Sequence, residues 1–326
     1  MQLPPPRGPL SSWLNDSLLR RETAVGGVEV GVRDDPYADD DLQLALWIAY
    51  ELQYRGFDDV DPERQWDPAI IAFRSRLERP WTDWLQTTCR SRVDERPVAE
   101  QLRALIDGVD GPRFAPYIRR HATREQVREF VLNRSVYQLK EADPHSFGIA
   151  RLDGAAKAAL VEIEADEYGG GRPERMHSEL FRTTMRWLDL DDTYGYYVSA
   201  VPAVTLAVSN VMSLFAIHSR WTAALLGHLA AFEMTSTLPN RQYATGAIRL
   251  GASEAQARYF TEHVEADAVH EQVASHDLCG NYVRERPDAI GDVLFGARCA
   301  LTLDDLFADD LLTRWNAPDR SARRCG

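Results

Sequence analysis

The sequence is poor in cysteine and has no closely spaced cysteine pair. The four thiols stand at positions 89, 279, 299 and 325, and no two of them form the CxxC spacing of a thiolate zinc site. We therefore expect free thiols and a reducing compartment, the cytoplasm. The first residues, MQLPPPRGPLSSW, show no basic segment followed by an apolar one, so we expect no signal peptide.

Basic residues are also in the minority. The 37 Lys and Arg stand against 50 Asp and Glu, a net charge of −13, which disfavours nucleic acid or an anionic membrane surface as a partner. The longest apolar stretch, residues 200–232, is interrupted by polar residues such as Ser209, Asn210 and Arg220, so it indicates a buried helix and not a membrane span. No GxGxxG motif occurs, so a bound nicotinamide or flavin is not predicted.

What the sequence does contain is a succession of helical patterns. With 44% hydrophobic residues and eight Trp, the 326-residue chain can build a large core. Only residues 25–33 offer a weak strand pattern, so we predict an all-α fold. Helices are expected at 39–55, 67–79, 123–140, 153–168, 173–187, 202–233, 253–276 and 288–312, with two short ones between 81 and 107.

The segment DGVDGPRFAP, residues 107–116, has turn chemistry and marks a predicted domain boundary. Residues 1–116 contain no histidine and gather no catalytic residue types. We interpret them as a helical scaffold or dimerisation layer, which makes a homodimer the expected assembly. Residues 117–326 are then the domain that carries the chemistry.

The stretch from Tyr259 to His276, YFTEHVEADAVHEQVASH, carries the most informative pattern. As a helix it places His263, Asp267 and His270 on one face, because they are separated by four and three residues. Two imidazoles and a carboxylate form a mixed nitrogen and oxygen ligand set, which suits iron or zinc better than magnesium or calcium. We therefore predict a metal site on this helix.

Other predicted helices can supply the remaining donors of a two-metal site in a bundle. One ends near Glu141, the next carries Glu167 and, beyond three glycines, His177, and the long apolar helix carries Glu233. A carboxylate on an apolar helix is costly to bury unless it is paired or bound to metal. The complete donor set, enough for two iron ions, is Glu141, Glu167, His177, Glu233, His263, Asp267 and His270.

Simpler interpretations remain open for three of these positions. Glu233 could pair with Arg241 at a helix end, and Glu141 could be exposed beside Lys140. On the second helix, Glu162 and Glu164 compete with Glu167, and Glu164 could take its place because it lies nearly one turn earlier on the same face. His218 and His228 could be core or pocket residues, whereas His145 and His276 are expected at the surface or behind the ligands.

The three glycines at 169–171 cost about 1 kcal/mol each in a helix, so a bend between functional residues would explain them.

The segments EYGGGRPERMH, residues 167–177, and HVEADAVH, residues 263–270, resemble the haem-oxygenase-like diiron oxidases and oxygenases. These enzymes use a haem-oxygenase-type helical bundle to bind two irons in place of haem. The resemblance covers about residues 120–290 and implies that the donor set binds iron, with Glu233 a ligand in some states. The N-terminal region resembles the extra helical domain of the streptozotocin-pathway N-oxygenase, but the cupin domain of that enzyme is not expected here.

The resemblance implies an oxygenase with two iron ions, O2 as co-substrate and an external electron donor. The third imidazole, His263, resembles the members that oxidise nitrogen, so the expected substrate is an amine or guanidine of specialised-metabolite biosynthesis. No side chain beyond the metal ligands is expected to be catalytic. The alternatives are a desaturase or C–C bond-cleaving oxidase acting on a fatty or amino acid, and a non-catalytic helical metal-binding protein.

Overall fold

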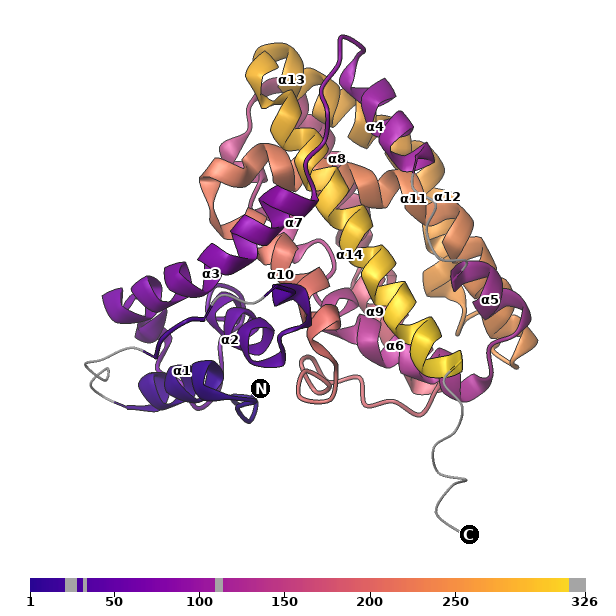
Figure 1. The fold of residues 1–326 in the computed structure, drawn as a ribbon. Coiled ribbons are helices and arrows are strands. Elements are labelled where there is room, and N and C mark those ends of the chain that lie inside the picture. Colours follow the sequence, from indigo (N-terminus) through magenta and orange to yellow (C-terminus); the bar gives the residue numbers. More distant parts are fainter. Residues whose placement is uncertain (21–27, 32–33, 109–113, 317–326) are drawn as a thin grey trace.

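The computed structural model describes residues 1–20, 28–31, 34–108 and 114–316, apart from the side chains of residues 265–268. Every regular element in these ranges is helical, which confirms the all-α prediction (Figure 1). Residues 28–31 form no strand, and the rest of the weak strand candidate lies mostly outside the described residues. No helix in the described ranges has the length and apolarity needed to cross a bilayer.

The first three helices gather on one side of the molecule, and the last helix, yellow in Figure 1, runs diagonally across the remainder. This group consists of α1 (Pro9–Leu19), α2 (Asp40–Glu51) and α3 (Pro68–Thr88), whereas α4 (Val98–Asp107) lies apart from it and packs against the last helix and the segment Val273–Gly280. The helices that follow are α5 (Phe114–Arg120), α6 (Arg124–Gln138), α7 (Asp143–Ser146), α8 (Gly154–Glu167), α9 (His177–Trp187), α10 (Ala203–Ile217), α11 (Thr222–Arg249), α12 (Arg258–Gln272), α13 (Asn281–Glu285) and α14 (Ile290–Asn316). A π-helical segment, Val273–Gly280, joins α12 to α13.

Two helices continue through a proline and past their predicted ends. Helix α3 continues through Pro80, and α11 continues through Pro239 to Arg249. A proline inside a helix costs about 3 kcal/mol, and burial on both sides offsets this cost. Leu77 and Trp81, on either side of Pro80, are both fully buried.

The long apolar helix expected at 202–233 is two helices, α10 and α11. The break falls at His218, whose backbone is extended (φ −102°, ψ 113°). The imidazole Nε2 of His218 lies 2.9 Å from the Glu78 carboxylate of α3, so a contact with another helix accompanies the break. Sequence periodicity cannot reveal such a long-range contact.

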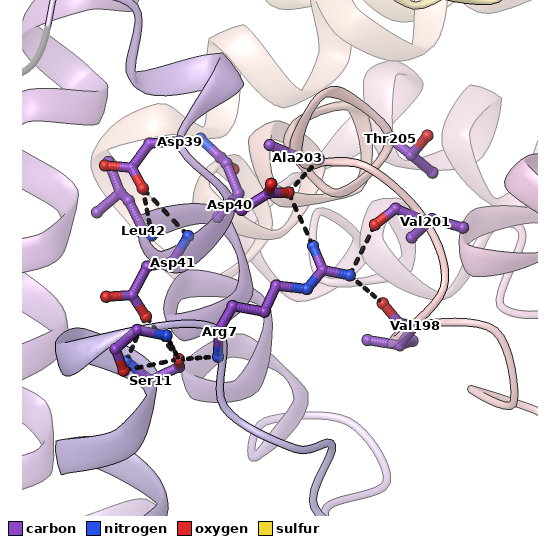
Figure 2. Close-up of polar contacts among 12 residues, drawn as sticks. Arg7, Ser11, Asp39, Asp40, Asp41, Leu42, Val198, Val201, Ala203 and Thr205 are labelled. Atoms are coloured by element: carbon purple, nitrogen blue, oxygen red, sulfur yellow. Dashed lines mark hydrogen bonds and ion pairs between the residues drawn. The ribbon is translucent and has the colours of Figure 1, made fainter. Parts of the chain in front are cut away.

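Three consecutive aspartates each stabilise the start of a different helix (Figure 2). Asp39 accepts hydrogen bonds from the backbone of its own helix α2, as an N-cap should. Asp40 accepts from the backbone N–H of Ala203 at the start of α10, and Asp41 accepts from Leu10 and Ser11 at the start of α1. Helix α1 therefore receives its cap from a distant residue, a contact that the sequence around the helix does not indicate.

Arg7 adds a second link between the N-terminal segment and α10. Its guanidinium donates to the carbonyls of Val198 and Val201 at 2.9 and 2.6 Å, and it pairs with Asp40 at 3.1 Å (Figure 2). One apolar core contains residues from both sides of position 116. The division into residues 1–116 and 117–326 stays a prediction, because shared packing does not test independent folding.

Helices α11 and α14 cross at very short range. A Cβ atom added to Gly227 would lie 1.8 Å from the carbonyl oxygen of Val293, and one added to Gly296 would lie 1.9 Å from that of Ala224. Only glycine allows this approach. The crossing fixes the apolar half of α11, which carries Glu233 toward the interior.

A buried ion pair connects α2 to the segment that carries Glu141. Lys140 Nζ lies 3.5 Å from Glu51 Oε2, and both side chains are almost completely buried. The hydroxyl of Tyr194 donates to the same Glu51 oxygen at 2.7 Å, and Lys140 lies over the ring of Tyr54. Burial lowers the pKa of Lys140, and Glu51 acts in the opposite direction.

Replacing Glu51 with Gln should destabilise the fold by about 3–5 kcal/mol, because it leaves the Lys140 ammonium buried without a counter-ion. Urea titration of the parent and the variant measures the loss. Glu95→Gln, an identical change at an exposed position, should stay within about 0.5 kcal/mol of the parent. Equal effects of the two changes would refute a structural role for the pair.

Candidate metal centre

Six of the seven predicted donors meet in the interior, brought together by five segments of the chain. Glu141 lies in the turn after α6, Glu167 ends α8 and His177 begins α9. Glu233 comes from α11, and His263 and His270 come from α12. The side chain of the seventh, Asp267, lies outside the described residues.

The donors form two overlapping groups that share Glu167. Candidate donor atoms of Glu141, Glu167, His177 and His263 all lie within 4.8 Å of one another, and so do those of Glu167, Glu233 and His270. In the first group, His177 Nδ1 is 2.8 Å from Glu167 and His263 Nε2 is 3.6 Å from Glu141. Glu167 is therefore the one carboxylate that both groups contain.

The simpler interpretations of the carboxylates do not match this geometry. Glu233 is buried and lies 3.3 Å from His270 Nδ1, whereas Arg241 is exposed. Glu141 accepts hydrogen bonds from the Tyr259 hydroxyl, so its carboxylate points inward. Glu164 is buried but belongs to neither donor group.

The three glycines form the turn that brings Glu167 and His177 together. Gly169, Gly170 and Gly171 all have positive φ, at 66°, 60° and 78°. A Cβ at Gly169 would also lie 2.7 Å from the backbone of the returning chain. Side chains disfavour this left-handed conformation, so the bend predicted between functional residues requires glycine here.

Two residues outside the predicted set orient the donors. The Nδ1 atom of His263 lies 2.8 Å from the backbone carbonyl of Tyr259, which leaves Nε2 facing Glu141. His270 Nε2 lies 3.0 Å from the exposed carboxylate of Asp166, while Nδ1 faces Glu233. Such partners hold metal-binding imidazoles in place. Tyr259 could have been found from its spacing of four residues to His263, which puts both on one helix face.

The electrostatics of the cluster show that its carboxylates depend on positive charge. Burial opposes ionisation of Glu167, but the imidazoles of His177, His263 and His270 outweigh it and hold the pKa of this carboxyl group well below its usual range. Burial also opposes the charged form of His270, yet Glu233 and Asp166 raise its pKa to about 9. Burial raises the pKa of Glu233. Protons on the imidazoles therefore supply charge that a divalent cation could replace, so the donor set fits a metal.

A cavity of about 340 Å³ opens onto the cluster. Glu141, Glu167, Glu233 and His263 lie in its wall. Much of the remaining wall is aromatic, with Phe130, Tyr137, Phe181, Phe232, Tyr243, Tyr259 and Phe260. The arrangement can hold a small molecule with an apolar body next to the donors.

Two histidines form a buried pair at the cavity. His145 is 1% exposed and lines the cavity, so of its two expected places, at the surface or behind the ligands, the surface is wrong. Its Nε2 lies 3.3 Å from Nδ1 of the buried His228. Burial lowers the pKa of His145 to about 4, although Glu167 acts in the opposite direction. Both imidazoles are therefore neutral at physiological pH.

Replacing Tyr259 with Phe should weaken divalent-metal binding about tenfold to a hundredfold, because Glu141 loses the hydroxyl that orients it. Calorimetric titration of the metal-free protein with Fe(II) under anaerobic conditions measures the change. Tyr243→Phe removes a hydroxyl from the same cavity wall without touching a donor, so its affinity should match the parent. The role assigned to Tyr259 is wrong if both variants bind equally well.

The His145 pair predicts a loss of stability in acid. A histidine whose pKa is lowered in the folded state contributes fully to the free energy of unfolding at pH values above its unfolded pKa of about 6.5. This contribution falls as the pH drops toward the folded pKa of about 4. Between pH 7.5 and 5.0 the metal-free parent should lose about 2 kcal/mol more than His145→Gln. Urea titrations at both pH values test this, with the exposed His121→Gln as the control that should keep the parent's pH dependence.

The comparison with protein families agrees with the geometry of the cluster. A model of the family described as iron-containing redox enzyme matches residues 128–305, more than half of the chain. All the candidate donors fall inside this segment. No curated protein sequence matches the chain. The chain therefore belongs to the family of iron-containing redox enzymes.

Proposed function

We propose that the chain is a non-haem diiron oxygenase that uses O2 to oxidise an amine or guanidine nitrogen. The observation that carries the proposal is the pair of donor groups that share Glu167. Glu141, His177 and His263 would hold one ion, Glu233 and His270 the other, and Glu167 would bridge them. Mixed imidazole and carboxylate donors suit iron.

The irons, when bound, would supply activation of O2 and transfer of an oxygen atom to the substrate. The protein would bury the metal ligands, hold them in position and keep water away from the substrate. The helices bury the donors, Tyr259 and Asp166 hold Glu141 and His270 in position, and the aromatic wall excludes water from the substrate side. Asp267 lies one helical turn from His263 and stays a proposed seventh donor.

The choice of nitrogen as the atom oxidised rests on His263. Its Nε2 faces Glu141, so the first donor group contains two imidazoles, those of His177 and His263. Without His263 this group would contain the imidazole of His177 alone. This third imidazole of the site is the feature that resembles the N-oxygenating members of the family. The sequence contains no dinucleotide-binding GxGxxG motif, so we also propose an external electron donor.

Reaction products test the proposed chemistry. Protein loaded with Fe(II), supplied with O2, a reductant and a panel of primary amines and guanidines, should yield hydroxylamine, N-hydroxyguanidine or nitro products, detected by mass spectrometry. Protein without iron should yield none. Alkenes or cleaved chains as the only products would favour the desaturase or C–C bond-cleaving alternative and contradict nitrogen oxidation.

The number of ions tests the ligand assignment independently. Anaerobic calorimetry with Fe(II) should give two ions per parent chain and a clearly weakened site in His263→Ala, because one donor of the first group is lost. His276→Ala, an exposed histidine beyond the same helix, should leave both sites intact. Unchanged stoichiometry and affinity in His263→Ala would remove this residue from the metal site.

A further inference from the structure

One carboxyl group in the cavity is not used by the metal site. Glu164 lies on α8, one helical turn before Glu167, and is only 2% exposed. It lines the cavity, but it belongs to neither group of clustered donors. Neither of its carboxyl oxygens has a hydrogen-bond partner among the described residues. A buried carboxyl group in this state normally costs several kcal/mol, so it needs a function.

No positive charge among the described residues compensates Glu164. Burial and the neighbouring carboxylates of Glu167, Glu233 and Asp143 all raise its pKa, to about 9, and no nearby cation lowers it. Among the described residues of the cavity wall, Arg134 is the one arginine or lysine, and it is already paired with Asp304. Iron at the donor groups would neutralise Glu141, Glu167 and Glu233 and leave Glu164 without a partner.

We propose that Glu164 binds the cationic nitrogen group of the substrate, an ammonium or guanidinium, and positions it beside the metal donors. A bound cation, together with iron at the neighbouring donor groups, would favour the ionised form of Glu164. Its two oxygens can then accept two N–H hydrogen bonds, and charge-assisted bonds of this type are about twice as strong as neutral ones. The aromatic wall then contacts the apolar body of the same molecule. The inference rests on the proposed function for the identity of the reacting nitrogen, but the binding step can be tested without any reaction.

The same residue could instead be an additional iron ligand. Its exclusion from both donor groups argues against this interpretation, because its oxygens do not lie within 4.8 Å of every donor in either group. The two roles predict different outcomes. A substrate-binding carboxylate affects the affinity for cations and leaves the iron content unchanged, whereas a ligand affects the iron content.

The test is calorimetric binding of two probes to anaerobic, Fe(II)-loaded protein at pH 8. The probes are 4-phenylbutylamine, which is cationic, and 4-phenylbutan-1-ol, a neutral molecule of similar shape. The parent should bind the amine about tenfold to a hundredfold more tightly than the alcohol, as expected for a buried hydrogen bond to a charged group. Glu164→Gln should lose this preference, retain its affinity for the alcohol and bind the same amount of iron.

Glu162→Gln provides a matched control, because it changes the same residue type on the exposed face of the same helix. It should bind both probes and iron as the parent does. Equal binding of the two probes by the parent, a preference retained in Glu164→Gln, or a loss of iron in that variant would each overturn the proposal. If the amine binds through Glu164 but nitrogen is never oxidised, the proposed function fails and the assignment of Glu164 stands.

Discussion

The structure depends on keeping several carboxylates inside an apolar helical bundle. Glu141, Glu167, Glu233 and Glu164 all line one cavity, and the last three are more than 90% buried. Unpaired, such charges would repel one another and favour water. The protein surrounds three of them with imidazoles whose protons balance part of the charge, and a pair of divalent ions would balance more. The fourth carboxyl group, Glu164, has no such balancing charge in the part of the chain that the structure describes.

The rest of the fold holds these groups in place. The glycine turn reverses the chain between Glu167 and His177, and the close crossing of α11 and α14 carries Glu233 inward. The ion pair of Glu51 and Lys140 fastens the turn that contains Glu141 to a helix of the N-terminal region. Residues far from the cluster in sequence therefore determine the positions of its donors, so the N-terminal region takes part in building the site.

Much of this arrangement could be predicted from sequence, because local rules govern it. The helical spacing of His263 and His270, the capping box of Thr123 and Gln126, and the bend at the glycines all depend on neighbours in the chain. The predicted helix boundaries were wrong where contacts between residues distant in sequence determine where a helix begins or ends. Helix α1 is capped by Asp41, His218 contacts Glu78 across the break between α10 and α11, and packing carries two helices through their prolines.

The cavity itself shows the same limit. Sequence periodicity placed Glu164 as a possible substitute for Glu167, since both face the same way on α8, but it could not show which of them meets the imidazoles. His145 and His228 are separated by 83 residues, and only the folded chain shows that they are a buried pair. The sequence thus predicted which residues could be donors. The charged groups that surround each donor could be identified only from the structure.

We propose that one buried cluster holds two iron ions and that both ions share Glu167. Anomalous X-ray diffraction at the iron absorption edge, from crystals grown with Fe(II) under anaerobic conditions, tests this most directly. The account predicts two peaks, one near Glu141, His177 and His263 and the other near Glu233 and His270, with the Glu167 carboxylate between them. A single peak, or iron bound elsewhere on the chain, would contradict it.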